Sequence, residues 1–269
     1  MSAAVAVPFD VRLMNATAWA LYAVFLAIML GALLSWAANR ATFSIGAITV
    51  TGDVSHNNAI TLRANVVPKV GGSFLTLDLA QAKQAFEAVP WVRRAVVKRE
   101  FPNRLKVVLQ EHQPVAYWGP EGDSRLLNSF GEVFEANLGE VEQEILPRLS
   151  GPAGQEPQVL VMYRLLQPLF EPMDLSLEQL DLTGRGSWVA TLDTGAVVEI
   201  GRGSEIEIVA RTERFLKTLT QVTSRYNRKP DAVETADLRH GTGYALRLRG
   251  VSTVVNDTAK NSAMKPSSR

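Results

Sequence analysis

The sequence predicts an α+β protein with a single N-terminal transmembrane helix, a small sheet with two helices, and then a mainly antiparallel β domain with flanking helices. Three observations lead to this fold class. A long uncharged apolar run lies near the N-terminus, strand and helix patterns alternate over residues 43–111, and short β-like runs separated by turn signals follow. The length of 269 residues suits two modest folded units with tails.

The first predicted element is a membrane span over residues 19–39. No charged residue occurs between positions 13 and 38, and about 20 apolar residues cross a bilayer. Trp19 and Trp36 stand where interfacial aromatic belts lie, and Arg12 and Arg40 flank them. The slight charge bias favours a cytoplasmic tail over residues 1–18. A cleaved signal peptide is the alternative, although its apolar region usually has 7 to 15 residues.

A first folded unit is predicted over residues 43–111. Residues 43–50 alternate as a strand does and end at the turn pair Gly52-Asp53. A short helix follows, because Ile60, Ala64 and Val67 stand at helical spacing, behind possible caps at Ser55 or Asn57.

The second helix of this unit begins at Asp78, which forms a capping-box pattern with Gln81. Two β-rich runs, residues 92–101 and 105–111, then predict a hairpin, so a small sheet is covered on one face by two helices. Six basic residues gather in this hairpin, either as a solvated, protected edge or as a docking surface for an acidic protein or lipid headgroups: Arg93, Arg94, Lys98, Arg99, Arg104 and Lys106.

A second unit is predicted over residues 112–255, because short β-like runs recur there between turn signals. One helix is expected near residues 158–170, and another begins at Ser204 with Glu207 as its capping-box partner. Residues 256–269 are polar and without periodicity, which predicts a disordered tail. The predicted strands are residues 125–127, 132–134, 177–182, 188–192, 197–200, 233–238 and 244–248.

The composition indicates no enzyme and no cofactor. The 28 basic and 27 acidic side chains give a net charge of +1, which offers no basic face for nucleic acid. There is no cysteine, and His56, His112 and His240 stand far apart, without metal-ligand spacing. No G-x-S-x-G nucleophile elbow or nucleotide fingerprint occurs, so no small-molecule substrate is expected. An acid pair remains an open alternative, since carboxylates are numerous.

The last predicted strand is the strongest candidate for a binding site. Asp237-Leu238-Arg239-His240 leads through Gly241-Thr242-Gly243 into the alternating run 244–249. If this strand lies at a sheet edge, its N–H and C=O groups can accept a strand from a partner, and Arg239 or Arg247 can select acidic side chains. The alternative is an ordinary internal or self-protected strand.

The ordered motifs of the chain resemble those of the FtsQ/DivIB family of division proteins, from the membrane span to about residue 250. Each motif is short, and their order and spacing carry the resemblance. They include Val50-Thr51-Gly52, Phe74-Leu75-x-Leu77-Asp78-Leu79, Pro90-Trp91-Val92, Phe101-Pro102-Asn103-x-Leu105, Leu127-Asn128-x-x-Gly131-x-Val133-Phe134, Ser187-Trp188, Gly201-Arg202-Gly203 and Asp237-Leu238-Arg239.

This resemblance implies that the first unit is a POTRA domain, that the second is the family's β domain, and that the protein is a non-enzymatic divisome scaffold. It implies an inner-membrane protein, N-terminus cytoplasmic and bulk periplasmic, at the division septum, that binds FtsB and FtsL and through them influences the synthases FtsW and FtsI. In the family's binding segment, His240 replaces a Tyr and Thr242 a Ser. The partner-binding residues expected for strand addition are Arg185, Arg239, His240, Thr242, Gly243, Tyr244, Leu246 and Arg247.

Two other classes of function stay open at this stage. A membrane-anchored cell-wall enzyme would need a convergent acid pair or metal cluster, which the motifs do not provide. A POTRA-type envelope assembly factor would need a lipid-facing β-barrel after the first unit, and no such pattern follows.

Overall fold

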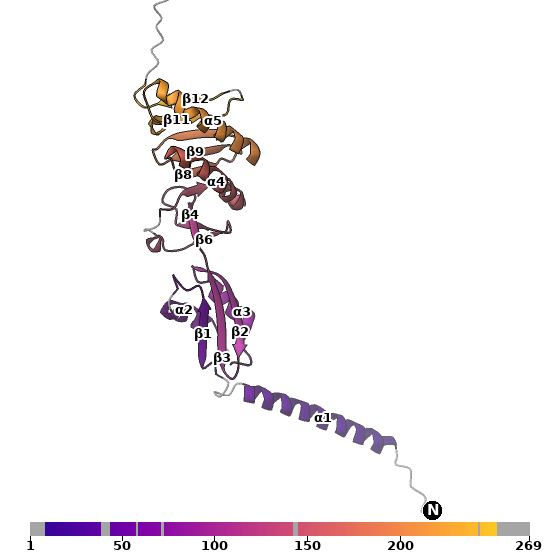
Figure 1. Cartoon of the computed structure of the whole chain (residues 1–269). Helices are drawn as coiled ribbons and strands as arrows, with labels where there is room; N and C mark the ends of the chain where they lie inside the picture. Colours follow the sequence, from indigo (N-terminus) through magenta and orange to yellow (C-terminus); the bar gives the residue numbers. More distant parts are fainter. Residues whose placement is uncertain are drawn as a thin grey trace, which may run out of the picture. The chain divides into compact units, whose positions relative to one another are not determined.

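The computed structural model describes residues 9–38, 44–57, 59–70, 73–141, 145–241 and 243–251. The chain divides into two compact units, Met1–His112 and Gln113–Arg269 (Figure 1). The N-terminal helix α1 spans Phe9–Ala38 and is, within the described ranges, the one helix long and apolar enough to cross a membrane. It overlaps the predicted span 19–39. The predicted tail over residues 256–269 lies outside the described residues.

The sheet of the first unit has three strands in the order β1-β3-β2, with β1 parallel and β2 antiparallel to β3. The element order confirms the prediction of strand, two helices and hairpin. The elements are β1 (Ala47–Gly52), α2 (Ala59–Val66), the 3-10 turn η2 (Val67–Lys69), α3 (Leu79–Glu87), β2 (Val92–Glu100) and β3 (Arg104–Glu111).

Helix α3 forms as its sequence predicts. The Asp78 side chain accepts hydrogen bonds from the backbone N–H groups of Ala80 and Gln81, which caps the first turn. Its apolar face is buried, since Phe86 on the helix and Val89 after it lie in the core with Val92 and Leu109 of the sheet.

Helix α2 buries a different face from the one that its spacing marks. Leu62 and Val66 lie in the core. Ile60 is 81% exposed, Val67 is 46% exposed, and Ala64 is exposed as well. Both sets fit a helical period, so an eight-residue helix does not reveal by itself which set faces the sheet.

A buried carboxylate closes one end of this unit. Glu111, 4% exposed, accepts hydrogen bonds from the backbone N–H of His56 and from the backbone and side-chain N–H groups of Asn57, at 2.8 to 3.0 Å. The His56 ring also stacks on Trp91, with centroids 3.9 Å apart. The sequence predicted Glu111 only as the end of a strand, and Asn57 as a helix cap.

The second unit is built on a nine-stranded mixed sheet, in which five of the eight described pairings are antiparallel. Its order is β12-β11-β10-β9-β8-β7-β4-β5-β6. The strands are β4 (Pro114–Trp118), β5 (Arg125–Asn128), β6 (Val133–Glu135), β7 (Arg148–Ser150), β8 (Leu177–Leu182), β9 (Trp188–Leu192), β10 (Val197–Gly201), β11 (Val233–Asp237) and β12 (Ala245–Leu248).

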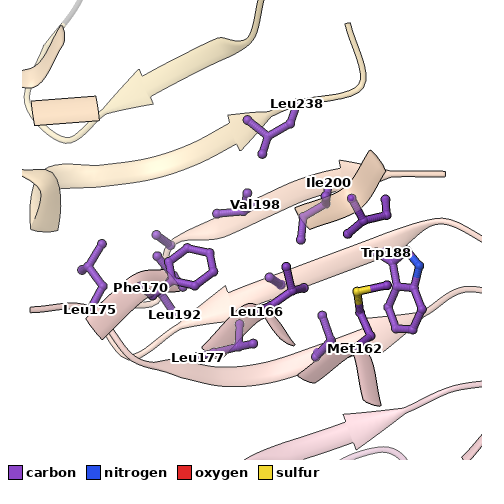
Figure 2. Close-up of a cluster of buried hydrophobic side chains, with 14 of the residues drawn as sticks. Met162, Leu166, Phe170, Leu175, Leu177, Trp188, Leu192, Val198, Ile200 and Leu238 are labelled. Carbon is purple, nitrogen blue, oxygen red and sulfur yellow. The ribbon is translucent and has the colours of Figure 1, made fainter. Parts of the chain in front are cut away.

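Two helices of this unit, α4 (Glu156–Phe170) and α5 (Glu205–Arg225), supply much of its core. Figure 2 shows Met162, Leu166 and Phe170 of α4 packed with Trp188 of β9 and Val198 of β10, all buried. Burial of these large side chains contributes roughly 1.5 to 3 kcal/mol each, which holds the sheet to its helices.

The start of α5 confirms its predicted capping box. The Ser204 hydroxyl accepts from the Glu207 N–H, and the Glu207 carboxylate accepts from the Ser204 N–H at 2.8 Å. The sequence missed β4 and β7, the two parallel strands that join β5 and β6 to the rest of the sheet. Strand β7 has three residues and β4 begins with Pro114, so neither shows a clear strand pattern.

Candidate protein-binding site

Strand β12 lies at one end of the nine-stranded sheet. It pairs antiparallel with β11, with Asp237 opposite Ala245 and Thr235 opposite Arg247. Among the described residues no strand pairs with its outer side. The sequence-based condition for strand addition, an edge position for the last strand, is therefore met.

One hydrogen bond shows which backbone N–H groups of β12 point toward β11 and which point away from it. Arg249 donates its N–H to the carbonyl oxygen of Ala232 at 2.8 Å, across the pair toward β11. Because N–H groups alternate along an antiparallel strand, those of Leu246 and Leu248 point to the open side. These are the groups that an added strand would use.

Tyr244 attaches the start of β12 to helix α5. Its ring meets Phe215 edge to face, with centroids 5.0 Å apart, and its hydroxyl lies 2.8 Å from the Thr218 hydroxyl. Gly243 precedes it and is exposed. The aromatic contact and the hydrogen bond fix the entry of the chain into the edge strand.

A groove of about 580 Å³ runs between α5 and β12. Val222 and Tyr226 line one side, and Tyr244, Leu246 and Leu248 line the other. A smaller pocket of about 320 Å³ opens beside it, where the basic side chains Arg211, Arg214 and Lys217 of α5 meet Leu238 and His240. An added strand would thus find apolar surface beside the open backbone and cations at its end.

Arg239 follows β11 and binds two carboxylates of its own chain. Its Nη2 lies 2.6 Å from the Asp237 Oδ2, and its Nη1 lies 2.8 Å from the Glu199 carboxylate. The hydrogen bonds from Arg239 lower the pKa of Asp237 from 3.8 to about 2. Because the Arg239 side chain is 54% exposed, a partner carboxylate can reach it. That carboxylate would compete with those of Asp237 and Glu199.

The other predicted cations lie on the same edge or at the same end of the sheet. Arg247 forms a cross-strand ion pair with Glu234 at 3.0 Å, and exposed His240 lies 4.0 Å from the Asp237 carboxylate. Arg185 is exposed in the β8–β9 turn and makes no hydrogen bond or ion pair with the described residues.

The strand register places the turn that carries Arg185 at the same end of the sheet as Arg239. Trp188, three residues after Arg185, pairs with Gly201, and a Cβ on Gly201 would lie 2.8 Å from the Arg239 Cγ. Thr242 lies outside the described residues. The sequence missed the α5 side of the groove, although a signal existed, because the apolar Val222 and Tyr226 stand one helical turn apart.

No grouping of three or more His, Cys, Asp or Glu side chains that could hold a metal occurs in the part of the chain that the structure describes. His56 and Glu111, whose side chains lie 3.3 Å apart in the first unit, form the structural contact given above. The β12 edge can contact another chain in three ways: through backbone pairing, through apolar surface and through charge.

Two family models match the chain. One, the POTRA domain, FtsQ-type, matches residues 43–112, and the other, Cell division protein FtsQ/DivIB, C-terminal, matches residues 116–239. The second match ends at Arg239, so the hairpin loop and β12 lie beyond it.

Curated relatives extend the similarity over nearly the full length. The chain is 38% identical over 268 residues to the cell division protein FtsQ of Thiomonas arsenitoxydans, which covers 98% of this chain and 96% of the relative. It is 38% identical over 252 residues to FtsQ of Burkholderia pseudomallei, covering 93% and 98%. FtsQ of Bordetella pertussis is 34% identical over 277 residues, covering 97% and 98%.

These matches confirm the resemblance seen in the motifs and the POTRA identity of the first unit. Family members are non-enzymatic proteins of the division machinery, which settles the choice against a cell-wall enzyme. The chain belongs to the FtsQ/DivIB family of cell division proteins.

Proposed function

We propose that this division protein is a scaffold that binds FtsB, together with FtsL, by accepting a strand at the β12 edge. Through these partners it links early to late division proteins and influences septal peptidoglycan synthesis by FtsW and FtsI. The observation that carries the proposal is the open edge of β12 beside the groove lined by α5. Free N–H and C=O groups next to apolar surface are what strand addition requires.

The bound strand would make three kinds of contact. Its backbone would pair with the outward groups of Leu246 and Leu248, and its alternate side chains would enter the groove beside Tyr244. Acidic side chains would bind Arg239, Arg247 or Arg185 at the rim. We assign the remaining predicted contacts to His240, Thr242 and Gly243 in the hairpin loop.

We further propose a single-pass type II anchor in the inner membrane, with residues 1–18 cytoplasmic, residues 19–39 in the membrane and the bulk of the chain periplasmic. In this assignment residues 43–111 form the POTRA domain, residues 112–255 the β domain and residues 256–269 a disordered tail. The uncharged run over residues 13–38 of helix α1 supports the anchor. A reporter enzyme that is active only in the periplasm, fused after Arg269, should be active; an inactive C-terminal fusion with an active N-terminal one would reverse the orientation.

A calorimetric titration of the full chain in detergent micelles with the extracytoplasmic parts of FtsB and FtsL tests partner binding. Leu246→Pro removes an outward N–H of β12. Glu135→Pro is the matched control, because β6 is the opposite edge of the same sheet and Glu135 is exposed.

We expect Leu246→Pro to abolish binding and Glu135→Pro to retain it. Equal affinity of a folded Leu246→Pro variant would refute strand addition at β12. Equal loss in both variants would assign the effect to general damage of the sheet.

A further inference from the structure

The two outer strands of the first unit's sheet differ in charge. Strand β2 carries Arg93, Arg94, Lys98 and Arg99, whereas β1 and residues 44–46 before it carry no charge and no proline. The register of β1 with β3 is continuous, so no bulge interrupts it. Charged side chains, prolines and bulges protect a sheet edge from strand addition; β2 has this protection and β1 lacks it.

An apolar groove of about 520 Å³ lies at the unprotected strand. It is formed by β1 and the residues before it, by α2 and η2, and by Phe86 of α3. Figure 1 shows α2 beside β1. None of the lining residues is charged: Ile45, Gly46, Ala47, Ile48, Val50, Leu62, Val66, Val67, Val70 and Phe86.

Helix α2 and the turn η2 that follows it expose apolar side chains next to this groove. Ile60, Ala64 and Val67, which share helical spacing, are exposed, while Leu62 and Val66 reach the core. Val67 itself lines the groove. Single exposed apolar residues are ordinary, but a stripe of them beside an apolar groove marks a surface suited to a partner.

The backbone of β1 is available on its outer side. Asp53, just after β1, donates its N–H to the Leu109 carbonyl at 3.1 Å, and Gly52 lies opposite Leu109 in the parallel register. Because the direction of N–H groups alternates along a strand, those of Thr49 and Thr51 also point toward β3, and those of Ile48 and Val50 point away from it. Among the described residues no strand pairs with that side.

We propose that the β1 edge is a second protein-binding site, distinct from β12, which accepts an extended, uncharged segment of another protein with apolar side chains at alternate positions. Its backbone would extend the three-stranded sheet, and alternate side chains would enter the groove beside α2. A charged segment does not suit the site, because the lining offers no counter-charge and burying an unpaired charge is costly.

A second copy of this chain is a poorer occupant than a separate segment. Helix α2 already lies beside β1 and helps to form the groove. Two copies paired through β1 would bring two α2 helices to the same place. An isolated strand avoids this conflict, so the occupant is a segment without a helix of its own at that position.

The test uses the full chain in detergent micelles and a fluorescein-labelled peptide, Thr-Val-Thr-Ile-Thr-Val-Thr with both ends blocked, followed by fluorescence anisotropy. Ala47→Lys and Val67→Lys each place a charge at an exposed position of the groove. Val96→Lys is the matched control, because Val96 is 42% exposed on β2, the other edge strand. A peptide with alternate amides N-methylated removes the backbone donors but keeps the side chains.

We expect both groove variants to weaken binding by about tenfold or more, Val96→Lys to bind as the unchanged protein does, and the N-methylated peptide not to bind. Any of three results would overturn the proposal. They are no binding by the unchanged protein, undiminished binding by both groove variants, and equal binding of the N-methylated peptide. A dimer in sedimentation that Ala47→Lys dissociates would replace the separate segment with a second copy of the chain.

Discussion

The Arg239 guanidinium donates two hydrogen bonds to the Asp237 carboxylate, from Nε to Oδ1 at 2.8 Å and from Nη2 to Oδ2 at 2.6 Å. The backbone N–H of Arg239 donates to the same carboxylate at 3.0 Å. The pair therefore holds the guanidinium and the turn after β11 in one arrangement. The sequence predicts that Arg239 contacts a partner. In the structure, carboxylates of its own chain already orient its guanidinium.

This pair predicts the titration of Asp237. Its pKa is about 2 in the folded chain, below the ordinary value of 3.8, so the ionised carboxylate stabilises the fold. That contribution is complete above about pH 4 and is lost as the pH falls through about 2. Carboxyl carbon shifts in NMR should report the low pKa, and Arg239→Ala should return it toward 3.8. Equal midpoints in the two proteins would show that Arg239 is not the cause.

Substitution of Arg239 should separate partner binding from internal pairing. Arg239→Glu places a third carboxylate beside Asp237 and Glu199 and should weaken FtsB binding by roughly 2 to 5 kcal/mol, as loss of a buried charged partner does. Glu199→Gln removes one internal competitor and should leave the affinity equal or a few-fold higher. Calorimetry that finds unchanged affinity for Arg239→Glu would end the charge-pair proposal.

The cross-strand pair between Arg247 and Glu234 allows a charge exchange. The double change Arg247→Glu with Glu234→Arg keeps an ion pair between β11 and β12, so thermal stability should stay within about 1 kcal/mol. If Arg247 binds a partner acid, the exchanged protein should still lose affinity for FtsB. Full affinity in the exchanged protein would confine Arg247 to its internal pair.

Tyr244 and Thr218 should act as one unit. Tyr244→Phe keeps the ring on Phe215 but removes the hydroxyl that lies 2.8 Å from Thr218, at a cost of about 0.5 to 1.5 kcal/mol in stability. Thr218→Ala should add little more once that hydroxyl is gone. Urea unfolding of both single variants and the double variant measures this coupling, and fully additive losses would show that the contact contributes nothing.

Glu111 should be essential for the first unit. Glu111→Ala leaves the backbone N–H groups of His56 and Asn57 and the Asn57 amide without their buried acceptor, and should destabilise this unit by roughly 2 to 4 kcal/mol. Hydrogen exchange at residues 56 and 57 should accelerate. Glu100→Ala, at the exposed end of β2, is the matched control and should change little. Unchanged exchange in Glu111→Ala would contradict the role of the carboxylate.

Local patterns predicted most helices and strands because each depends on a few neighbouring residues. The caps at Asp78 and Ser204 formed as expected, since an acceptor side chain and the first free N–H groups lie within one turn. Strands β4 and β7 were not predicted, because each is short and pairs with strands that are distant in sequence.

For the candidate site, the sequence predicted the segment and its cations but not their surroundings. Alternation marked residues 244–249, and the structure added the α5 groove and the carboxylates around Arg239. Neither Glu199 nor Thr218 is near the hairpin in sequence. Only folding brings them there.

The sequence by itself determined the long apolar N-terminal helix, the order of the elements, the α+β class and the family motifs, because these depend on composition and on periods of two or 3.6 residues. The tertiary structure decided the edge position of β12, the face that α2 buries, and the pairing of Arg239 with two internal carboxylates. Such features arise from packing between segments far apart in the chain. A local sequence pattern does not indicate which distant segment will pack against it.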